Sequence, residues 1–175
     1  MRLSFFERVR VLRQEPIASV RMMGVSEGQK VVDIGAGSGY FTIPAALVVG
    51  TRGIVYSVEP DSTRSDRIAK RVAGEGLQNV RVLATGAEEL QAISSDSIDL
   101  VFSAFSIHHF SDRQVALSEI RRILRKGGTF YVWDRMPGRI VKHGTKVEEL
   151  SKFSDGFEKF ELLGTKGAVR ARFTK

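Results

Sequence analysis

Short apolar runs rich in β-branched residues alternate with longer amphipathic segments from residue 30 onward. The short runs predict strands at 30–34, 53–58, 80–84, 98–103 and 129–134. The segments between them predict helices at 40–49, 62–73, 87–91 and 112–125. Regular alternation of strand and helix is typical of a parallel sheet covered by helices. The pattern therefore predicts an α/β fold.

The helix at 112–125 shows this periodicity most clearly. Its apolar positions recur at spacings near 3.6, which places one face toward the core. Ser111 or Asp112 is expected to cap its first turn, and Gly127 and Gly128 to end it. The residues expected on the buried face are Val115, Leu117, Ile120, Ile123 and Leu124.

The two ends of the chain follow different patterns. Residues 1–23 predict one helix, or two helices broken at Pro16. Near the other end, 146–153 predict a short helix, and the alternating segments 157–163 and 168–174 predict an antiparallel hairpin.

The length of the chain limits how these elements can be divided. With 175 residues it can bury one core, but it is too short for separate cofactor and substrate domains. We therefore expect a single domain over 1–175, with 1–28 as a helical cover and 29–175 as the α/β core.

A glycine-rich segment follows the first predicted strand in the sequence VVDIGAGSGY, residues 31–40. Such a turn lets the backbone approach a ligand, and the helix that follows presents free N–H groups. We expect Gly35 to make the turn, Gly37 to admit the ligand and Gly39 to let the helix pack closely on the strand. The alternative is a dinucleotide fingerprint, G-x-G-x-x-G, but here the third glycine comes one residue early and Tyr40 takes the last position.

Two acidic residues extend this signal. Glu59 ends the second predicted strand, where a carboxylate can accept hydrogen bonds from both hydroxyls of a ribose. Asp33 lies two residues before Gly35 and can organise the loop or meet a cationic group of the ligand. Pro60 then redirects the chain toward the next helix.

From residue 29 onward the sequence resembles the class I S-adenosylmethionine-dependent methyltransferases, especially the group that includes the ubiquinone and menaquinone biosynthesis enzymes. The motifs that carry the resemblance are VDIGAGSGYFT, YSVEP, ATGAEEL, DSIDLVFSAFSIHHFSD and EIRRILRKGGTFYVWD. The resemblance implies a Rossmann-like three-layer sandwich. Its sheet would have seven mostly parallel strands in the order 3-2-1-4-5-7-6, with an antiparallel strand from the C-terminal hairpin, and S-adenosyl-L-methionine as the cofactor.

The same resemblance implies which residues hold the cofactor. The glycine loop would line its methionine side, Glu59 its ribose, the turn at 86–88 its adenine, and the end of the fourth strand would complete the cleft. Members of the family often carry an aspartate where this chain has Gly86, so the contact to the adenine amino group is either lost or made by backbone or by Glu88. The full set implied is Asp33, Gly35, Ala36, Gly37, Gly39, Tyr40, Glu59, Pro60, Gly86, Ala87, Glu88, Ser103, Ala104 and Phe105.

Two histidines are the candidates for catalysis. His108 and His109 follow the fourth strand, and imidazole is well suited to move protons near neutral pH. The alternative is that both only shape the cleft or cap the next helix. Phe105 and Phe110 are candidates for an apolar acceptor wall or for core packing, and His143 is expected on the surface.

Composition narrows the function further. The absence of cysteine excludes disulfides, cysteine nucleophiles and thiolate metal sites, and no metal site is expected. No apolar run is long enough to span a membrane, and no signal peptide is recognised, so a cytoplasmic protein is expected. The net charge of +7 fits a solvated surface or an RNA partner.

Three functions remain open at this point. The first is methylation of a small-molecule acceptor, for which a homo-oligomer could help to exclude water from the cleft. The second is methylation of RNA or protein, and the third is a non-catalytic subunit that binds the cofactor.

Overall fold

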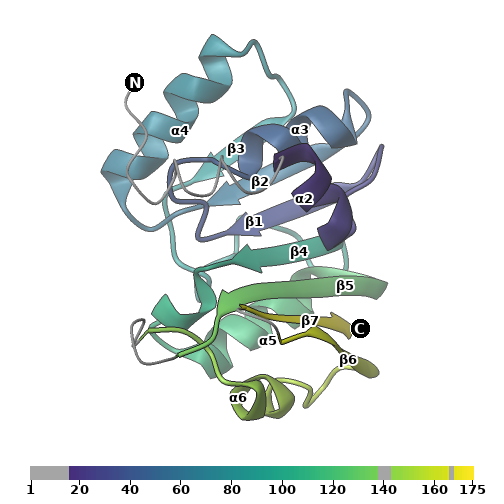
Figure 1. Cartoon of the computed structure of the whole chain (residues 1–175). Helices are drawn as coiled ribbons and strands as arrows, with labels where there is room; N and C mark the ends of the chain where they lie inside the picture. The colour runs from purple at the N-terminus through teal and green to yellow at the C-terminus, as the bar shows by residue number, and fades with distance from the viewer. Residues whose placement is uncertain (1–15, 138–142, 166–167) are drawn as a thin grey trace.

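The computed structural model describes residues 16–137, 143–165 and 168–175. Its centre is a seven-stranded sheet in the order β3-β2-β1-β4-β5-β7-β6 (Figure 1). The first five strands in this order are parallel, and β7 is antiparallel to both β5 and β6. The predicted fold and strand order are confirmed. The strands are β1 (Lys30–Ile34), β2 (Ile54–Val58), β3 (Val80–Leu83), β4 (Ile98–Ala104), β5 (Leu124–Arg135), β6 (Lys159–Gly164) and β7 (Ala168–Thr174).

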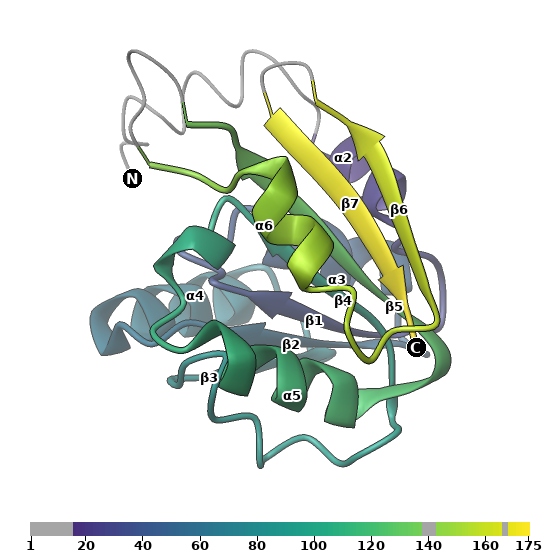
Figure 2. The ribbon, with the colours of Figure 1, turned by 90° about the horizontal axis from the view of Figure 1, so that it is seen from below.

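Helices cover both faces of the sheet and make the outer layers of the sandwich (Figure 2). On one face, α2 (Pro16–Met23), α3 (Thr42–Val49) and α4 (Ser62–Gly74) bury apolar side chains against the strands. On the other, α5 (Arg113–Ile123) and α6 (Val147–Lys152) do the same. Alternate residues of each strand face opposite layers, because the side-chain period of a strand is two. In β1, Val31 packs on the side of α2, α3 and α4, whereas Val32 and Ile34 pack on the side of α5 and α6.

The predicted N-terminal cover at 1–28 falls partly outside the described residues. Residues 16–28 of it are described, and the buried residues Val20 and Met23 of α2 pack in the same apolar cluster as α3. Residues 1–15 of the segment 1–23, predicted as one helix or as two broken at Pro16, lie outside the described part of the chain, as do residues 138–142 and 166–167. Within the described ranges, no helix combines the length and the apolar character needed to cross a membrane.

The predicted helix at 87–91 is wrong, because this segment is a turn in the structure. Its apolar residues Ala87 and Leu90 do face the core, as does Ile93 just after it. Its backbone polar groups, however, bond to α5 rather than to a helix of its own. The amide of Leu90 donates to Glu119 Oε2 at 3.1 Å, and the Arg122 guanidinium donates to the carbonyls of Leu90 and Ile93 at 2.9 and 3.0 Å.

The boundary between α5 and β5 also differs from the prediction. The helix ends at Ile123, and the strand begins at once with the fully buried Leu124, whose backbone is extended. The following glycines therefore belong to the strand, where the amide of Gly127 donates to the carbonyl of Lys175. At the other end, Asp112 caps α5 as expected, accepting from the second and third amides after it at 2.9 and 3.1 Å. Val115 is 45% exposed, so its predicted burial is wrong.

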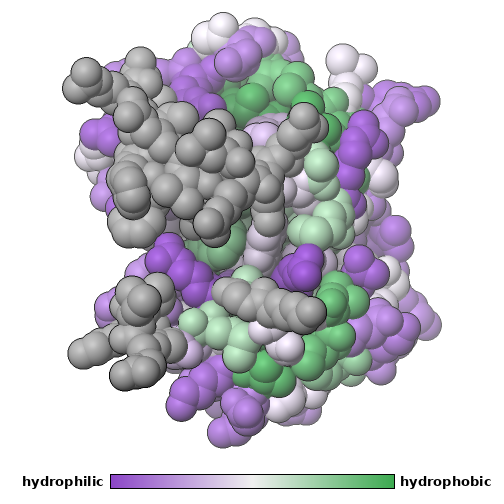
Figure 3. All heavy atoms as spheres, viewed as in Figure 1, coloured by the Kyte–Doolittle hydropathy of each residue, from purple (hydrophilic) through white to green (hydrophobic). Residues whose placement is uncertain are grey.

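The surface is mixed in character. Hydrophilic and hydrophobic residues are interspersed on the face that Figure 3 shows. Large apolar side chains that reach solvent are found on several separate elements, and isolated exposures of this kind are normal for globular proteins. The described residues concerned are Ile17, Met22, Leu47, Val115, Leu162 and Leu163.

Candidate functional site

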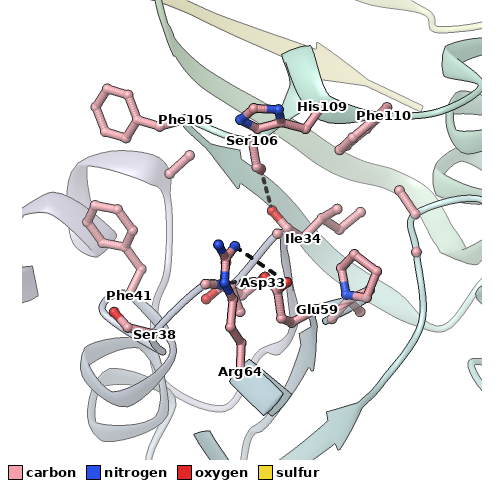
Figure 4. Close-up of a pocket in the computed structure, with 18 of the residues that line it drawn as sticks. Asp33, Ile34, Ser38, Phe41, Glu59, Arg64, Phe105, Ser106, His109 and Phe110 are labelled. Atoms are coloured by element: carbon pink, nitrogen blue, oxygen red, sulfur yellow. Dashed lines mark hydrogen bonds and ion pairs between the residues drawn. The ribbon is translucent and has the colours of Figure 1, made fainter. Parts of the chain in front are cut away.

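A cleft of about 710 Å³ opens at the carboxyl ends of the parallel strands (Figure 4). This is where open α/β sheets bind ligands, and the volume lies in the usual range for small-molecule sites. Its walls come from the ends of β1, β2, β4 and β5 and from the segments that follow β1, β2, β3 and β4. The lining residues are Asp33, Ile34, Gly35, Ala36, Gly37, Ser38, Tyr40, Phe41, Val58, Glu59, Pro60, Arg64, Arg67, Gly86, Ala87, Glu88, Ala104, Phe105, Ser106, His109, Phe110, Ser111 and Arg135.

The first glycine of the loop is required by a contact between two loops. Gly35 has φ of 72°, and a Cβ placed on it would lie 2.3 Å from the Cβ of Ser106. The Ser106 hydroxyl donates to the carbonyl of Ile34 at 2.7 Å and lies 2.7 Å from the hydroxyl of Ser103 (Figure 4). The loops after β1 and β4 are therefore joined at the floor of the cleft.

The other two glycines face different surroundings. The position of a Cβ on Gly37 is open, with no atom nearer than 4.0 Å, so a ligand can approach this backbone closely. Gly39 does not line the cleft. A Cβ on it would lie 3.3 Å from Ile68 of α4, so its close packing is against a neighbouring helix rather than against the strand that the sequence analysis named.

Glu59 is buried where the second strand ends, and it connects two loops. Its Oε2 accepts from the amide of Gly37 at 2.8 Å and its Oε1 from the amide of Asp61 at 3.2 Å. The guanidinium of Arg64 approaches the same carboxylate at 3.8 Å (Figure 4). A carboxylate can accept about four hydrogen bonds, so these two amides leave acceptor sites for a ligand's hydroxyls.

Asp33 lies under the glycine loop with only 2% of its surface exposed. The Thr42 hydroxyl donates to its Oδ2 at 2.7 Å and lies 3.0 Å from the Ser57 hydroxyl. Burial raises the pKa of Asp33 to about 7; the bond from Thr42 opposes this rise and the charge of Glu59 adds to it. A cationic ligand group near this carboxyl would favour its charged form.

The turn after β3 forms the far wall of the cleft. Ala87 is nearly buried, and Glu88 Oε1 accepts from the amide of Asp112 at 3.0 Å, which connects the turn to the start of α5. A Cβ on Gly86 would lie 2.7 Å from Glu88 Oε2. A side chain at position 86 would therefore displace the carboxylate of Glu88.

Phe105 stands at the opposite wall with an unusual backbone. Its φ is 60°, a left-handed conformation that is rare for a bulky residue. Its amide donates to the carbonyl of Trp133 at 2.6 Å, and the two rings lie 5.1 Å apart. Strained backbone of this kind is often found at functional sites, where surrounding structure holds it in place.

The two histidines occupy different environments. His108 is nearly buried and does not line the cleft. Its Nδ1 lies 2.9 Å from both carboxylate oxygens of Asp134, and the Thr145 hydroxyl donates to Asp134 Oδ2 at 2.6 Å. His109 lines the cleft and is exposed, with its ring centroid 4.0 Å from that of His108.

The electrostatic surroundings of His109 favour a neutral imidazole. Partial desolvation lowers its pKa below 6.5, and electrostatic repulsion from the neighbouring His108, Arg135 and His143 side chains lowers it further, while Asp134 opposes them. At pH 7 the ring can therefore accept a proton. The third histidine, His143, is exposed, as the sequence analysis expected.

The structure gathers most of the residues that the sequence pointed to in one cleft. Gly39, Ser103 and His108 lie behind its walls. The sequence analysis did not identify Ser106, just after β4, or the arginines that line the cleft. For Arg135 the sequence does contain a signal, because this residue ends a parallel strand, and ligands bind at the ends of such strands. The missed lining residues with polar side chains are Ser38, Arg64, Arg67, Ser106, Ser111 and Arg135.

Comparison with known proteins gives this cleft its family context. Residues 32–132 match the family described as "Methyltransferase domain", a match that covers more than half of the chain. The chain belongs to this family. The prediction that the chain is a member of the methyltransferases is thereby confirmed.

Relatives of the methyltransferase domain show a range of acceptors. The chain is 31% identical over 116 residues to a ubiquinone/menaquinone biosynthesis C-methyltransferase of Blochmanniella floridana. This alignment covers 66% of this chain and 45% of that protein. It is 32% identical over 111 residues to an aklanonic acid methyltransferase of Streptomyces sp. (strain C5), covering 62% and 50%. The chain thus spans about half the length of these curated relatives.

Solved structures confirm the fold. A SAM-dependent methyltransferase from Aquifex aeolicus superposes with a TM-score of 0.77 at 20% identity and covers 96% of each chain. A SAM-dependent O-methyltransferase from Thermotoga maritima gives a TM-score of 0.71 at 18% identity, covering 99% of this chain and 71% of the other.

Proposed function

We propose that this methyltransferase transfers the methyl group of S-adenosyl-L-methionine to a small-molecule acceptor. One observation carries the proposal: the open backbone of Gly37, the carboxylate of Glu59 and the turn at 86–88 line one continuous cleft. A nucleoside bound along the cleft would contact an open backbone, a hydrogen-bond acceptor and a turn in succession. The relatives that are named for quinone and aklanonic acid methylation act on small molecules, which supports the choice of acceptor class.

The cleft residues fit the cofactor chemically. Gly37 lets a ligand approach its backbone closely, and Glu59 has free acceptor sites for ribose hydroxyls. A nearby ammonium group of the ligand would favour the charged form of the buried Asp33 carboxyl. Because strands β3, β2 and β1 follow one another in the sheet, we assign adenine, ribose and methionine to their ends in that order. The reactive methyl would then face the ends of β4 and β5.

The chemistry requires positioning more than covalent help from the protein. S-adenosyl-L-methionine supplies a methyl group on a sulfonium, so an electron pair of the acceptor forms the new bond while the carbon–sulfur bond breaks and leaves its electrons on sulfur. The cleft walls hold the acceptor near the methyl carbon and exclude water. We assign to His109 the role of general base, which removes a proton from the methyl acceptor, because its imidazole lines the cleft and is neutral at pH 7.

A transfer assay tests the proposed function. Purified protein is incubated with S-adenosylmethionine carrying a labelled methyl group and with fractions of a cell extract. We expect label in small metabolites, in the cytoplasmic fraction. Label in RNA or protein instead would favour the alternative that the +7 net charge suggests. Cofactor binding with no transfer to any fraction would favour a non-catalytic subunit, and sedimentation of the active species would test a homo-oligomer.

His109→Gln tests the base. General bases contribute about 10²–10⁴-fold to rates, so we expect kcat to fall at least about 100-fold while the Kd for S-adenosylhomocysteine stays within about twofold. Because the pKa of His109 lies below 6.5, the wild-type rate should hold from pH 8 to about 6.5 and fall at lower pH. His143→Gln, which changes an exposed histidine that does not line the cleft, is the matched control and should keep kcat at pH 8. An unchanged kcat in His109→Gln would show that His109 is not the general base.

A further inference from the structure

We propose that the acceptor is a planar acid and that the guanidinium of Arg135 binds its anionic group. This inference rests on the proposed function, because it concerns the half of the cleft that the cofactor leaves open. The assignment of adenine, ribose and methionine to β3, β2 and β1 leaves the ends of β4 and β5 for the acceptor. Phe105 and His109 follow β4, and Arg135 ends β5.

The backbone of Arg135 is held at both of its polar groups. Its amide donates to Asp134 Oδ1 at 2.8 Å, and its carbonyl accepts from the amide of Thr145 at 2.9 Å. Gly144 packs against the same carbonyl so closely that a Cβ there would clash with it. The starting point of the side chain is therefore fixed at the rim of the cleft, as recognition of a ligand requires.

The charge of Arg135 is not neutralised within the described part of the chain, where no carboxylate forms an ion pair with it. The nearest candidate, Asp134, is fully buried and uses its oxygens for His108, Thr145 and the Arg135 amide. The guanidinium carbon lies instead 6.0 Å from the ring centroid of Phe105, at the range of a cation–π contact.

The acidic residues of the cleft lie at its other end. Asp33 lies near the end of β1, Glu59 directly follows β2, and Glu88 lies in the turn after β3. Each is already bonded, Asp33 to Thr42, Glu59 to loop amides and Glu88 to the amide of Asp112. The described acceptor half therefore carries positive charge and no acidic side chain, which favours an anionic ligand.

The remaining walls of the acceptor half are aromatic. Phe105 and Phe41 line one side, and both rings rest against Trp133, with centroids 5.1 and 6.2 Å away. His109 and Phe110 line the adjoining wall (Figure 4). Rings in these positions offer stacking surfaces for a flat ligand. A guanidinium beside them can hold a carboxylate through two parallel hydrogen bonds, which fixes the ligand's orientation.

A pair of matched probes tests this inference. Protein saturated with S-adenosylhomocysteine is titrated with 2-naphthoate and with 2-naphthamide, which has the same shape without the charge. We expect the acid to bind at least about 10-fold more tightly than the amide. In Arg135→Gln the difference should shrink to less than about threefold, with the Kd for S-adenosylhomocysteine unchanged. Arg135→Lys should retain part of it, because lysine keeps the charge but not the planar fork.

The controls separate the ways of failing. Arg81→Gln removes the same charge from an exposed position on β3 and should keep the full preference for the acid. Equal binding of acid and amide, no binding of either at millimolar concentration, or an undiminished preference in Arg135→Gln would overturn the inference. Weaker S-adenosylhomocysteine binding in Arg135→Gln would assign the arginine to the cofactor's carboxylate instead. Failure of the protein to bind S-adenosylhomocysteine at all would reject the proposed function itself.

Discussion

Gly35→Ala is expected to destabilise the protein and to abolish cofactor binding. The added methyl group would lie 2.3 Å from the Cβ of Ser106, at a residue with φ of 72°. Overpacking costs about 1–3 kcal/mol, and a Cβ in the left-handed region adds about 1–2 kcal/mol. The change should also separate the loops after β1 and β4, which Ser106 joins through the carbonyl of Ile34.

Denaturant unfolding and calorimetry measure the two effects of Gly35→Ala. We expect the free energy of unfolding to fall by roughly 2–5 kcal/mol and S-adenosylhomocysteine binding to drop below detection. Gly28→Ala is the matched control, since Gly28 has φ of 78° but no atom within 4 Å of the added methyl. It should show the backbone cost alone and bind normally. Equal losses of stability in the two variants would show that the contact with Ser106 does not limit position 35.

Asp33→Asn is expected to stabilise the protein while weakening cofactor binding. Burial raises the pKa of Asp33 from 3.8 to about 7, so above pH 7 the folded protein holds a charged carboxylate in a poorly solvated position. An asparagine can still accept the bond from Thr42 and carries no charge. Since one pH unit of pKa shift corresponds to about 1.4 kcal/mol, the gain at pH 8 should be on the order of 2–4 kcal/mol.

The pH dependence of this effect has a defined sign. The raised pKa means that the folded protein binds more protons than the unfolded chain between about pH 4 and 7, so the contribution of Asp33 to stability falls as pH rises through that window. Asp33→Asn should remove this fall, and Asp66→Asn, at an exposed residue of α4, should not. Thermal unfolding from pH 4 to 8 compares the two variants with the wild-type protein.

Cofactor binding should respond in the opposite direction at Asp33. A cationic group near the carboxylate would lower its pKa, so binding near pH 7 should release protons, and calorimetry in buffers of different ionisation enthalpy measures them. We expect Asp33→Asn to weaken S-adenosylhomocysteine binding at least about 10-fold and to end this proton release. A variant that is less stable at pH 8, or that binds as tightly as the wild type, would contradict this role for Asp33.

The sequence predicted the sheet well because its strands carry local signals. The parallel strands β1 to β4 are short runs rich in β-branched residues, and β7 has the predicted bounds because its residues alternate between buried and half-buried positions. The helix at 87–91 was predicted wrongly for a non-local reason. Its apolar spacing suits a helix, but the side chains of Glu119 and Arg122 bind its backbone groups. Contacts of this kind depend on tertiary structure, which single-sequence patterns do not contain.

The candidate site was predictable to a similar extent. The glycine loop and Glu59 carry signals in their spacing, and both line the cleft. The sequence could not predict that His109 lines the cleft and His108 does not. This depends on the contact between His108 and Asp134, which lies 26 positions away in the chain. Ser106 was missed for the same reason, since its bond to Ile34 joins residues 72 positions apart.

We propose that the loop after β1 and the carboxylate of Glu59 after β2 hold an adenosyl sulfonium compound rather than a dinucleotide. Calorimetric titration of the wild-type protein with S-adenosylmethionine, S-adenosylhomocysteine and NAD distinguishes the two ligand classes. We expect saturable binding of the first two, weakened at least about 10-fold in Glu59→Ala, and no measurable binding of NAD. Tight binding of NAD, with none of S-adenosylmethionine, would contradict it.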